Sequence, residues 1–323
     1  MEEALSQKAA VELWYGARKQ SALSPLATRT TGSEGREVGT GMKIAIQGEP
    51  GSFSHEATLA MLPDAVIVPC SVSADVFNAL ANESADGAVI PIENSLAGSV
   101  LEHFDLLLQH DVKVVRESQL RIRHNLIGIS STLDDIDRVF SHPVALAQCR
   151  RFLAEHPKME SFAFYDTAGS VKQLVELRDR HAAAIASDAA AHYYGAQILQ
   201  AGIEDNPENF TRFFLVQRTR DARFGLDADK TSLAFSVENR PGSLVAALNQ
   251  LSAMGTNLTK IESRPVQGKP WEYVFYVDCQ LHSSEEGSRA IQALKPHCAM
   301  VKELGRYREA ETKGKEQGVG NRE

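Results

Sequence analysis

Apolar and polar residues follow two alternating patterns along residues 43–217. Short apolar runs, typical of buried strands, alternate with segments whose apolar residues recur at helical spacing. The expected strands are 43–47, 65–68, 87–91, 112–117, 125–130, 161–165, 183–186 and 211–217. The expected helices are 54–62, 73–82, 99–110, 146–155, 170–179 and 189–194. This alternation predicts an α/β fold with largely parallel sheets, arranged as one domain or as two lobes.

A different pattern begins after a charged, glycine-containing segment at 218–230. The expected elements are a strand at 231–238, a helix at 243–254, strands at 258–264 and 272–281, a helix at 284–294 and a strand at 299–304. Their order, βαββαβ, is that of the ferredoxin-like split-βαβ unit. The sequence therefore predicts a second, smaller domain behind the α/β part.

The two ends of the chain lack a sustained pattern of apolar residues at helix or strand spacing. Residues 21–40 mix Ser, Thr, Gly and Pro with charges, and 308–323 are charged with several glycines. We expect a disordered extension at 1–41, or a true start at Met42, and a loose tail at 308–323.

Composition narrows the function classes. The chain has 323 residues, 43% of them hydrophobic, which is enough for one large core or two modest ones. A net charge of −8 argues against a general nucleic-acid binder, which would normally show a basic face. No apolar run approaches the length of a membrane span, and the acidic start lacks the apolar region of a secretory signal.

The four cysteines are too scattered for a zinc cluster or a disulfide framework; they are Cys70, Cys149, Cys279 and Cys298. We expect reduced thiols in a cytoplasmic protein that holds no metal.

Candidate chemistry lies where strands run into Ser-, Thr- and Gly-rich loops before helices. Four such junctions occur, at 47–57, 91–100, 141–149 and 166–171. Each places hydroxyls and free backbone N–H groups at a helix N-terminus, where carboxylates bind well. Any single junction is more simply a helix cap, but four in one α/β domain favour a ligand with several negative charges. Because no nucleotide-binding glycine motif is present, we expect a cofactor-free site for a small di-acid.

Several motifs, in this order, resemble those of the prephenate dehydratase family. They read GEPGSFSHEA at 48–57, PIENS at 91–95 with GSV at 98–100, SHPVALAQC at 141–149, DTAGSV at 166–171 and NFTRFF at 209–214. The second domain resembles an ACT regulatory domain, with PGSLV at 241–245 and ESRP at 262–265. The family's motif usually reads Gly-Ala-Leu-Val, and Ser243 stands here in place of the alanine.

The resemblance implies a periplasmic-binding-protein-like catalytic domain at 42–218, with one lobe at 42–118 and 200–218 and the other at 119–199. A linker at 219–230 would lead to the ACT domain at 231–307. The implied enzyme is a hydro-lyase that converts prephenate to phenylpyruvate, CO₂ and water. Aromatisation drives this reaction, so it needs no cofactor. The enzyme must hold two carboxylates and assist the departure of a hydroxide-like group.

The resemblance also assigns roles to residues. Thr211 is the expected catalytic residue, bonded to the leaving oxygen, and Glu93 and Asn94 are candidates for its protonation and orientation. Arg212, which should face away from Thr211, either pairs with a substrate carboxylate or is a solvated or lobe-bridging charge. The remaining candidate substrate ligands are Ser52, Ser95, Ser141, Gln148, Thr167, Gly169 and Ser170. For Thr167 and Ser170, N-capping is the close alternative. His55 is either an acid or base or a structural histidine packed beside the loop, and we leave it outside the catalytic core.

In the second domain the resemblance implies a phenylalanine site at an interface between two copies, and hence a homodimer or homotetramer. The implied effector-binding residues are Gly242, Ser243, Leu244, Val245, Glu262, Ser263, Arg264 and Pro265. Effector binding would shift an open–closed equilibrium of the catalytic cleft.

Two other functions remain open at this point. One is arogenate dehydratase, whose substrate carries an amino group in place of the keto group. The other is a non-catalytic two-lobed binding protein fused to an amino-acid sensor. Residues 1–41 are too short and too poorly periodic for a helical chorismate mutase domain, so we expect no mutase activity.

Overall fold

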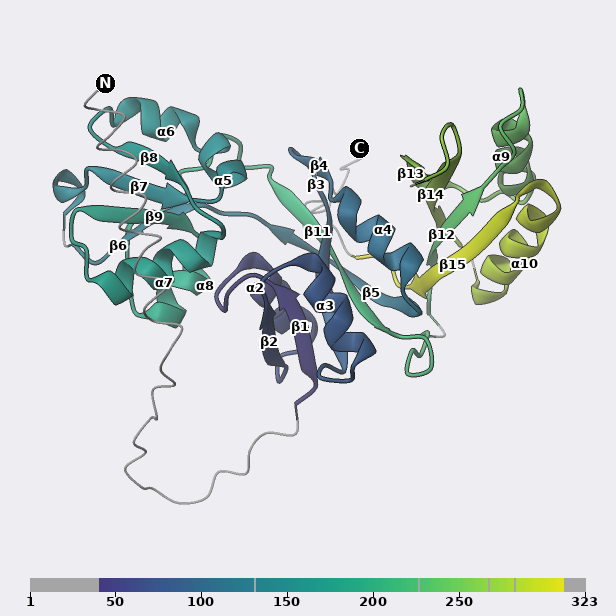
Figure 1. Ribbon diagram of the computed structural model, residues 1–323, viewed down its shortest axis with the longest axis horizontal. Helices are drawn as coiled ribbons and strands as arrows, with labels where there is room; N and C mark the ends of the chain where they lie inside the picture. Colours follow the sequence, from purple (N-terminus) through teal and green to yellow (C-terminus); the bar gives the residue numbers. More distant parts are fainter. Residues whose placement is uncertain (1–40, 131, 226, 267, 282, 311–323) are drawn as a thin grey trace, which may run out of the picture. The chain divides into compact units, whose positions relative to one another are not determined.

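The computed structural model describes residues 41–130, 132–225, 227–266, 268–281 and 283–310 (Figure 1). The predicted extension at 1–41 and tail at 308–323 therefore lie outside the described residues, apart from Gly41 and 308–310. The described strands form two sheets, one of ten strands and one of five.

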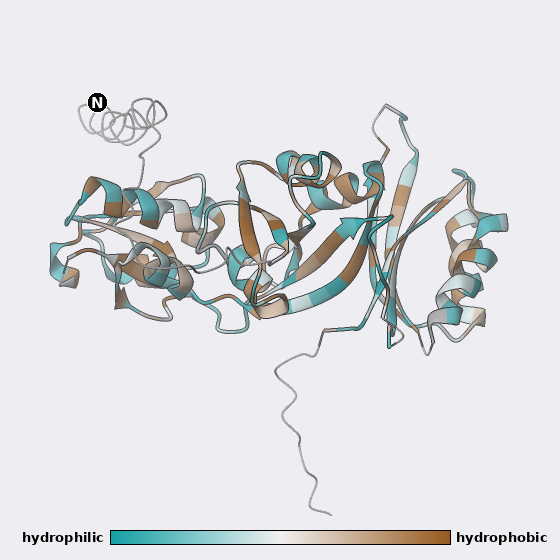
Figure 2. Cartoon of the chain, turned by 90° about the horizontal axis from the view of Figure 1, so that it is seen from below, coloured by the Kyte–Doolittle hydropathy of each residue, from teal (hydrophilic) through white to brown (hydrophobic). Residues whose placement is uncertain are grey.

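The first sheet contains the N-terminal strands and the strand that closes the α/β part. Its strands here are β1 (Lys43–Gln47), β2 (Val66–Cys70), β3 (Gly87–Asn94), β4 (Gly98–Ser99), β5 (Val112–Arg121) and β11 (Phe210–Arg218). Its helices are α2 (Phe53–Met61), α3 (Ser73–Ala81) and α4 (Leu101–Gln109). One face of the sheet packs on α2, and the other packs on α3 and α4. Figure 2 shows apolar residues gathered along the strands and mixed positions along the helices.

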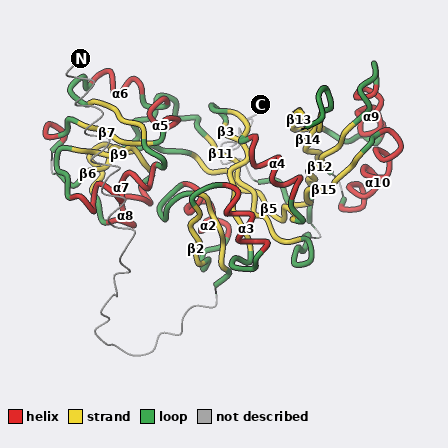
Figure 3. The backbone as a smooth tube through the Cα atoms, viewed as in Figure 1, coloured by secondary structure: helices red, strands yellow, loops and turns green. Residues whose placement is uncertain are grey.

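The second sheet forms the other lobe and has its own core. Its strands are β6 (Asn125–Gly128), β7 (Arg138–Ser141), β8 (Glu160–Ala163), β9 (Ala182–Ala186) and β10 (Gln197–Gln200). Its helices are η1 (Leu133–Asp135), α5 (Pro143–Ala147), α6 (Arg150–Glu155), α7 (Thr167–Leu177) and α8 (Asp188–Tyr194). Figure 3 shows α5 to α8 grouped around these strands. The predicted α/β class is confirmed.

Both sheets are mixed, so the expectation of largely parallel sheets was wrong. β1 pairs in parallel with β2 and β3, and β7 does so with β8 and β9. However, β11 runs antiparallel between β3 and β5, and β6 runs antiparallel to β9 and β10. The reason is connectivity. The chain leaves the first lobe along β5 and returns along β11, and a return strand laid beside the outgoing strand must be antiparallel to it.

The C-terminal elements confirm the predicted βαββαβ order. They are β12 (Lys230–Ser236), α9 (Ser243–Ala253), β13 (Leu258–Pro265), β14 (Tyr273–Gln280), α10 (Ser284–Leu294), η2 (Lys295–His297) and β15 (Met300–Tyr307). One face of these strands packs on α9 and α10 in a core of their own. The other face contributes Ala234, Val274, Tyr276 and Leu304 to the core beneath α3 and α4.

The four C-terminal strands belong to the same sheet as the first lobe. The strand order is β13-β14-β12-β15-β5-β11-β3-β1-β2, and β15 meets β5 where Gly305 pairs with Val114. A Cβ at Gly305 would lie 2.1 Å from the Val114 carbonyl oxygen, so only glycine allows this approach. This join was not expected from the sequence, which predicted two domains separated by a linker.

Candidate active site

Thr211 and Asn94 form a directly bonded pair on neighbouring strands. They are register partners on β11 and β3, and Asn94 Nδ2 donates to Thr211 Oγ1 over 2.9 Å. Thr211 is 8% exposed. The structure thus brings together two of the three predicted catalytic residues.

The orientation of the Asn94 amide is fixed by the turn that follows it. Its Oδ1 accepts from the backbone N–H groups of Leu96 (3.0 Å) and Ala97 (2.8 Å), so Nδ2 must face Thr211. Thr211 Oγ1 is then an acceptor in this bond, and its own proton has no acceptor among the described residues. This hydroxyl can donate to a substrate oxygen.

A chain of side-chain amides continues from this pair into the second lobe. Asn94 Nδ2 also donates to Asn209 Oδ1 (2.7 Å), and Asn209 Nδ2 donates to Gln148 Oε1 (3.0 Å). The same Gln148 oxygen lies 2.8 Å from His124 Nε2, which must therefore carry the proton. Burial lowers the pKa of His124, in keeping with a neutral ring. Predicted Gln148 is thus connected to Thr211 across the two lobes.

Two members of this chain, Asn209 and His124, were not among the predicted site residues. Asn209 opens the NFTRFF motif, and that position was the one available signal for it. His124 lies outside every motif, and nothing in its local sequence distinguishes it from a core histidine.

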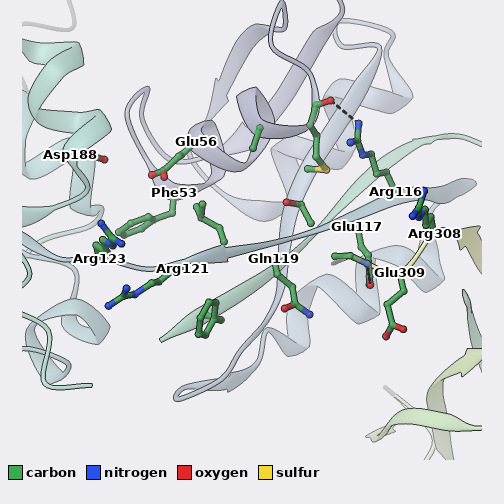
Figure 4. Close-up of a pocket in the computed structure, with 16 residues that line it drawn as sticks. Phe53, Glu56, Arg116, Glu117, Gln119, Arg121, Arg123, Asp188, Arg308 and Glu309 are labelled. Atoms are coloured by element: carbon green, nitrogen blue, oxygen red, sulfur yellow. Dashed lines mark hydrogen bonds between the residues drawn. The ribbon is translucent and has the colours of Figure 1, made fainter. Parts of the chain in front are cut away.

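A cavity of about 360 Å³ lies beside this chain. Gln148 and Asn209 line it together with Leu96 and Ala97 from the turn after Asn94 and Val144 from α5. A larger cavity of about 780 Å³ lies along β5, where Phe53, Arg121 and Arg123 stand at one end (Figure 4). None of the predicted catalytic or substrate-binding residues lines that larger cavity. Gln148, which is connected to Thr211 through Asn209 and Asn94, lines the smaller one, so we assign the candidate site to the smaller cavity.

The predicted residues at the starts of α2 and α7 lie at the N-cap or in the first helical turn. Ser52 is the N-cap of α2. The N-cap of α7 is Asp166, whose Oδ1 accepts from Gly169 N over 2.6 Å, so neither Thr167 nor Ser170 is the cap. Burial, ahead of all other causes, raises the pKa of Asp166 to about 6. Thr167 is the first helical residue, directly after this cap.

Three predicted serines already have hydrogen-bond partners. Ser141 Oγ donates to the Ile185 carbonyl and Ser170 Oγ to the Thr167 carbonyl, each over 2.6 Å. Ser95 Oγ donates to the Glu208 carbonyl and accepts from Phe210 N, which ties the turn after β3 to β11. These bonds give the three hydroxyl groups structural roles.

Glu93 and Arg212 lie on the opposite face of the sheet from Thr211, because successive side chains of a strand alternate. Arg212 donates to Glu117 (2.7 Å) and Asp278 (2.5 Å), and its pKa is raised by Tyr307, Asp278 and Glu117 although burial acts to lower it. Of the two interpretations left open for Arg212, this geometry favours a bridge between structural units.

Glu93 likewise has its partners on the face away from Thr211. Its Oε1 accepts from Lys260 Nζ over 2.8 Å, and its Oε2 lies 3.9 Å from Arg212 Nη1. The structure does not bring Glu93 together with Thr211.

The predicted effector residues lie on two separate elements. Gly242, with φ +82°, precedes α9, and Ser243, Leu244 and Val245 form its first turn; Val245 is 60% exposed. Along β13, Glu262 and Arg264 point toward the first lobe and bond Ser99 and Asp105. Ser263 and Pro265 alternate with them and are exposed.

Comparison with known proteins identifies the family. The family model for prephenate dehydratase matches residues 44–221. The chain belongs to the prephenate dehydratase family. The bifunctional chorismate mutase/prephenate dehydratase of Aquifex aeolicus is 38% identical over 272 residues, covering 83% of this chain and 74% of that protein. Arogenate dehydratase/prephenate dehydratase 2 of Arabidopsis thaliana is 37% identical over 280 residues, covering 83% and 73%.

A solved member of the family supports the fold. The prephenate dehydratase of Arthrobacter aurescens, crystallised with L-Phe, aligns with a TM-score of 0.74 and 31% identity, covering 83% of this chain and 90% of that one. The resemblance of the α/β part to the prephenate dehydratase family and the two-lobed fold are therefore confirmed. In the described part of this prephenate dehydratase family member, no helix is long and apolar enough to cross a membrane.

Proposed function

We propose that this protein converts prephenate to phenylpyruvate at the Thr211–Asn94 pair. In this reaction the bond to the ring carboxylate breaks, its electron pair enters the ring, and the ring C–O bond breaks. The departing oxygen takes a proton and leaves as water, so the products balance as phenylpyruvate, CO₂ and H₂O. The observation that carries the proposal is the Thr211 hydroxyl, in a chain that matches the family model. Its oxygen accepts a hydrogen bond from Asn94, and its proton has no acceptor among the described residues.

In this mechanism Thr211 donates a hydrogen bond to the leaving oxygen. A free threonine hydroxyl is a poor acid, so its role is to stabilise charge that develops on the oxygen and to relay a proton. Asn94 supports this role because its N–H occupies the Thr211 lone pair and directs the proton outward. Glu93 would have to leave Lys260 before it could act as the acid.

The two substrate carboxylates fit the starts of α2 and α7. Both helices present the positive end of a helix dipole, although the caps Ser52 and Asp166 already take one backbone N–H group at each start. The loop before α2 lies against the start of α7, since a Cβ on Gly48 would come within 2.6 Å of Asp166 Oδ2. Ser52, Thr167 and Gly169 belong to these two helix starts. A dianion can thus be held mainly by neutral donors, despite the net charge of −8.

We also propose that phenylalanine regulates the enzyme through the βαββαβ domain, as an ACT domain, at an interface between two copies of the chain. The L-Phe complex of the Arthrobacter aurescens protein supports the effector. The exposed residues Val245 and Ile261 support the interface. Four free cysteines fit a reducing compartment such as the cytoplasm.

The deciding experiment offers prephenate and arogenate side by side to pure protein and follows the aromatic products. We expect phenylpyruvate from prephenate at the higher kcat/KM. Preferential formation of phenylalanine from arogenate would instead assign the arogenate activity. No product from either, with thermal stabilisation by prephenate, would identify a binding protein.

A further inference from the structure

Strand β13 presents one row of charged side chains to the first lobe. Lys260, Glu262 and Arg264 alternate with exposed Ile261 and Ser263, as expected for a strand with one covered face. Lys260 is the most enclosed of the three, with 10% of its side chain exposed. Its stem lies near Phe104 of α4, with Nζ 5.7 Å from the ring centroid.

The Lys260 ammonium joins two residues that face each other across the β3–β4 hairpin. Its Nζ donates to Glu93 Oε1 (2.8 Å) and to Ser99 Oγ (2.9 Å). Glu93 and Ser99 are register partners in that hairpin. Ser99 Oγ in turn donates to Glu262 Oε2 over 2.7 Å. These three bonds join four residues, two of which come from β13.

The hairpin held in this way carries the catalytic asparagine. Asn94 follows Glu93 directly, pairs with Gly98 across the same hairpin and donates to Thr211. A shift of the hairpin would therefore move the Asn94 amide relative to the Thr211 hydroxyl. Small displacements of such groups cost large factors in rate.

We propose that Lys260 is a positioning residue, which holds the β3–β4 hairpin in its active arrangement and transmits the state of the effector-binding strand to Asn94. The inference rests on the proposed function, since Glu262 and Arg264 next to Lys260 belong to the proposed phenylalanine motif. Phenylalanine inhibits by drawing β13, and Lys260 with it, away from the hairpin. Lys260 Nζ lies 2.8 Å from a carboxylate oxygen of Glu93 and 4.0 Å from one of Glu262, so its loss leaves two neighbouring carboxylates without the charge between them and further disfavours the active arrangement.

The test compares Lys260→Met with the parent enzyme in prephenate turnover and in calorimetric phenylalanine binding. We expect kcat to fall about tenfold while KM for prephenate changes less than about twofold, the pattern of a lost transition-state interaction. Phenylalanine should still bind Lys260→Met but reduce its rate no further. Lys260→Arg, which keeps the charge, should restore both kcat and inhibition.

Two further variants separate this role from a general structural one. Lys269→Met removes an exposed lysine of the same domain, paired with Glu272 at 3.4 Å, and should behave as the parent. Ser99→Ala lies in the first lobe, away from the proposed effector site, and should also weaken inhibition. If Lys260→Met has a lowered melting temperature, the inhibition of Ser99→Ala decides whether the hairpin contacts transmit the effector signal.

The outcomes distinguish this inference from the proposed function. If phenylalanine inhibits the parent, and inhibits Lys260→Met and Ser99→Ala equally strongly with kcat unchanged, the role of Lys260 is overturned. The proposed function and regulation would still stand. A parent that turns over prephenate but neither binds nor responds to phenylalanine would contradict the proposed regulation itself. A parent without turnover of prephenate would contradict the proposed function.

Discussion

Glu56 on α2 shows how the fold changes the chemistry of a single carboxyl group. Its pKa is raised to about 7, first by burial and then by Asp188 at the start of α8, while Arg123 acts in the opposite direction. Figure 4 shows Glu56, Asp188 and Arg123 around Phe53 at one end of the larger cavity. The carboxylate form of Glu56 is therefore disfavoured in the folded protein relative to the unfolded chain.

This shift predicts a pH-dependent gain in stability for Glu56→Gln. The folded state keeps the Glu56 proton up to about pH 7, whereas the unfolded chain releases it near its ordinary pKa of 4.5. The parent consequently loses stability as pH rises between these values, and a neutral glutamine does not. The melting temperature of Glu56→Gln should match the parent at pH 4.5 and exceed it at pH 8.

Glu176→Gln on α7, which removes an exposed carboxylate, is the control for the loss of charge itself. A Glu56→Gln melting curve that shifts equally at pH 4.5 and pH 8 would contradict this account of Glu56.

The loop between β1 and α2 connects the first lobe to the second lobe beside the start of α2, where we propose that a substrate carboxylate binds. Gly51 has φ +87°, and a Cβ there would lie 2.8 Å from the Ala190 Cα of α8. The Gly51 carbonyl accepts from Ser187 Oγ over 2.7 Å, and Gly51 N donates to His55 Nδ1 over 2.8 Å. His55 therefore fastens the loop, which favours the structural role over that of an acid or base.

We predict that Gly51→Ala displaces this loop and lowers kcat/KM for prephenate. The methyl group must move the loop and Ser52 with it, and a displacement of this order costs about 10- to 100-fold in rate. Gly195→Ala is the matched control, because Gly195 also has a positive φ (+69°) but open space around its Cα. It should lose about 1 kcal/mol of stability and keep its kcat/KM. Equal kinetic losses in both variants would contradict the proposed role of the loop.

At the scale of the whole described chain, the C-terminal domain is built into the catalytic sheet. Buried charges line the join: Arg212 beside Thr211 bonds Asp278 of β14 and Tyr307 of β15, and Lys230 of β12 lies 3.2 Å from Glu117 of β5. Removing one partner of such a group leaves a buried charge without compensation, so the group resists separation of the two parts. A movement of the C-terminal strands should therefore displace β11, the strand that carries Thr211.

The sequence predicted most of this organisation but not its contacts. Strand and helix periods located the main elements, and the motifs identified the family and brought Asn94, Thr211 and Gln148 into one group. They could not reveal that Glu93 faces Lys260, because that contact joins residues 167 positions apart. The strands β7 and β10 also escaped, because each has only two adjacent apolar residues between polar ones. The pairing of β15 with β5 escaped because a single bridge leaves no periodic signal. Roles of the remaining site residues stay predictions.

The most direct test of the central claim is the rate of phenylpyruvate formation by Thr211→Ala and Thr211→Ser. Loss of the hydroxyl should lower kcat by about 10²- to 10⁴-fold, the range typical of a positioned proton-transfer group. Thr211→Ser keeps the hydroxyl and should retain most of the rate, and both variants should melt near the parent and bind phenylalanine. A folded Thr211→Ala with a nearly normal kcat would contradict the claim.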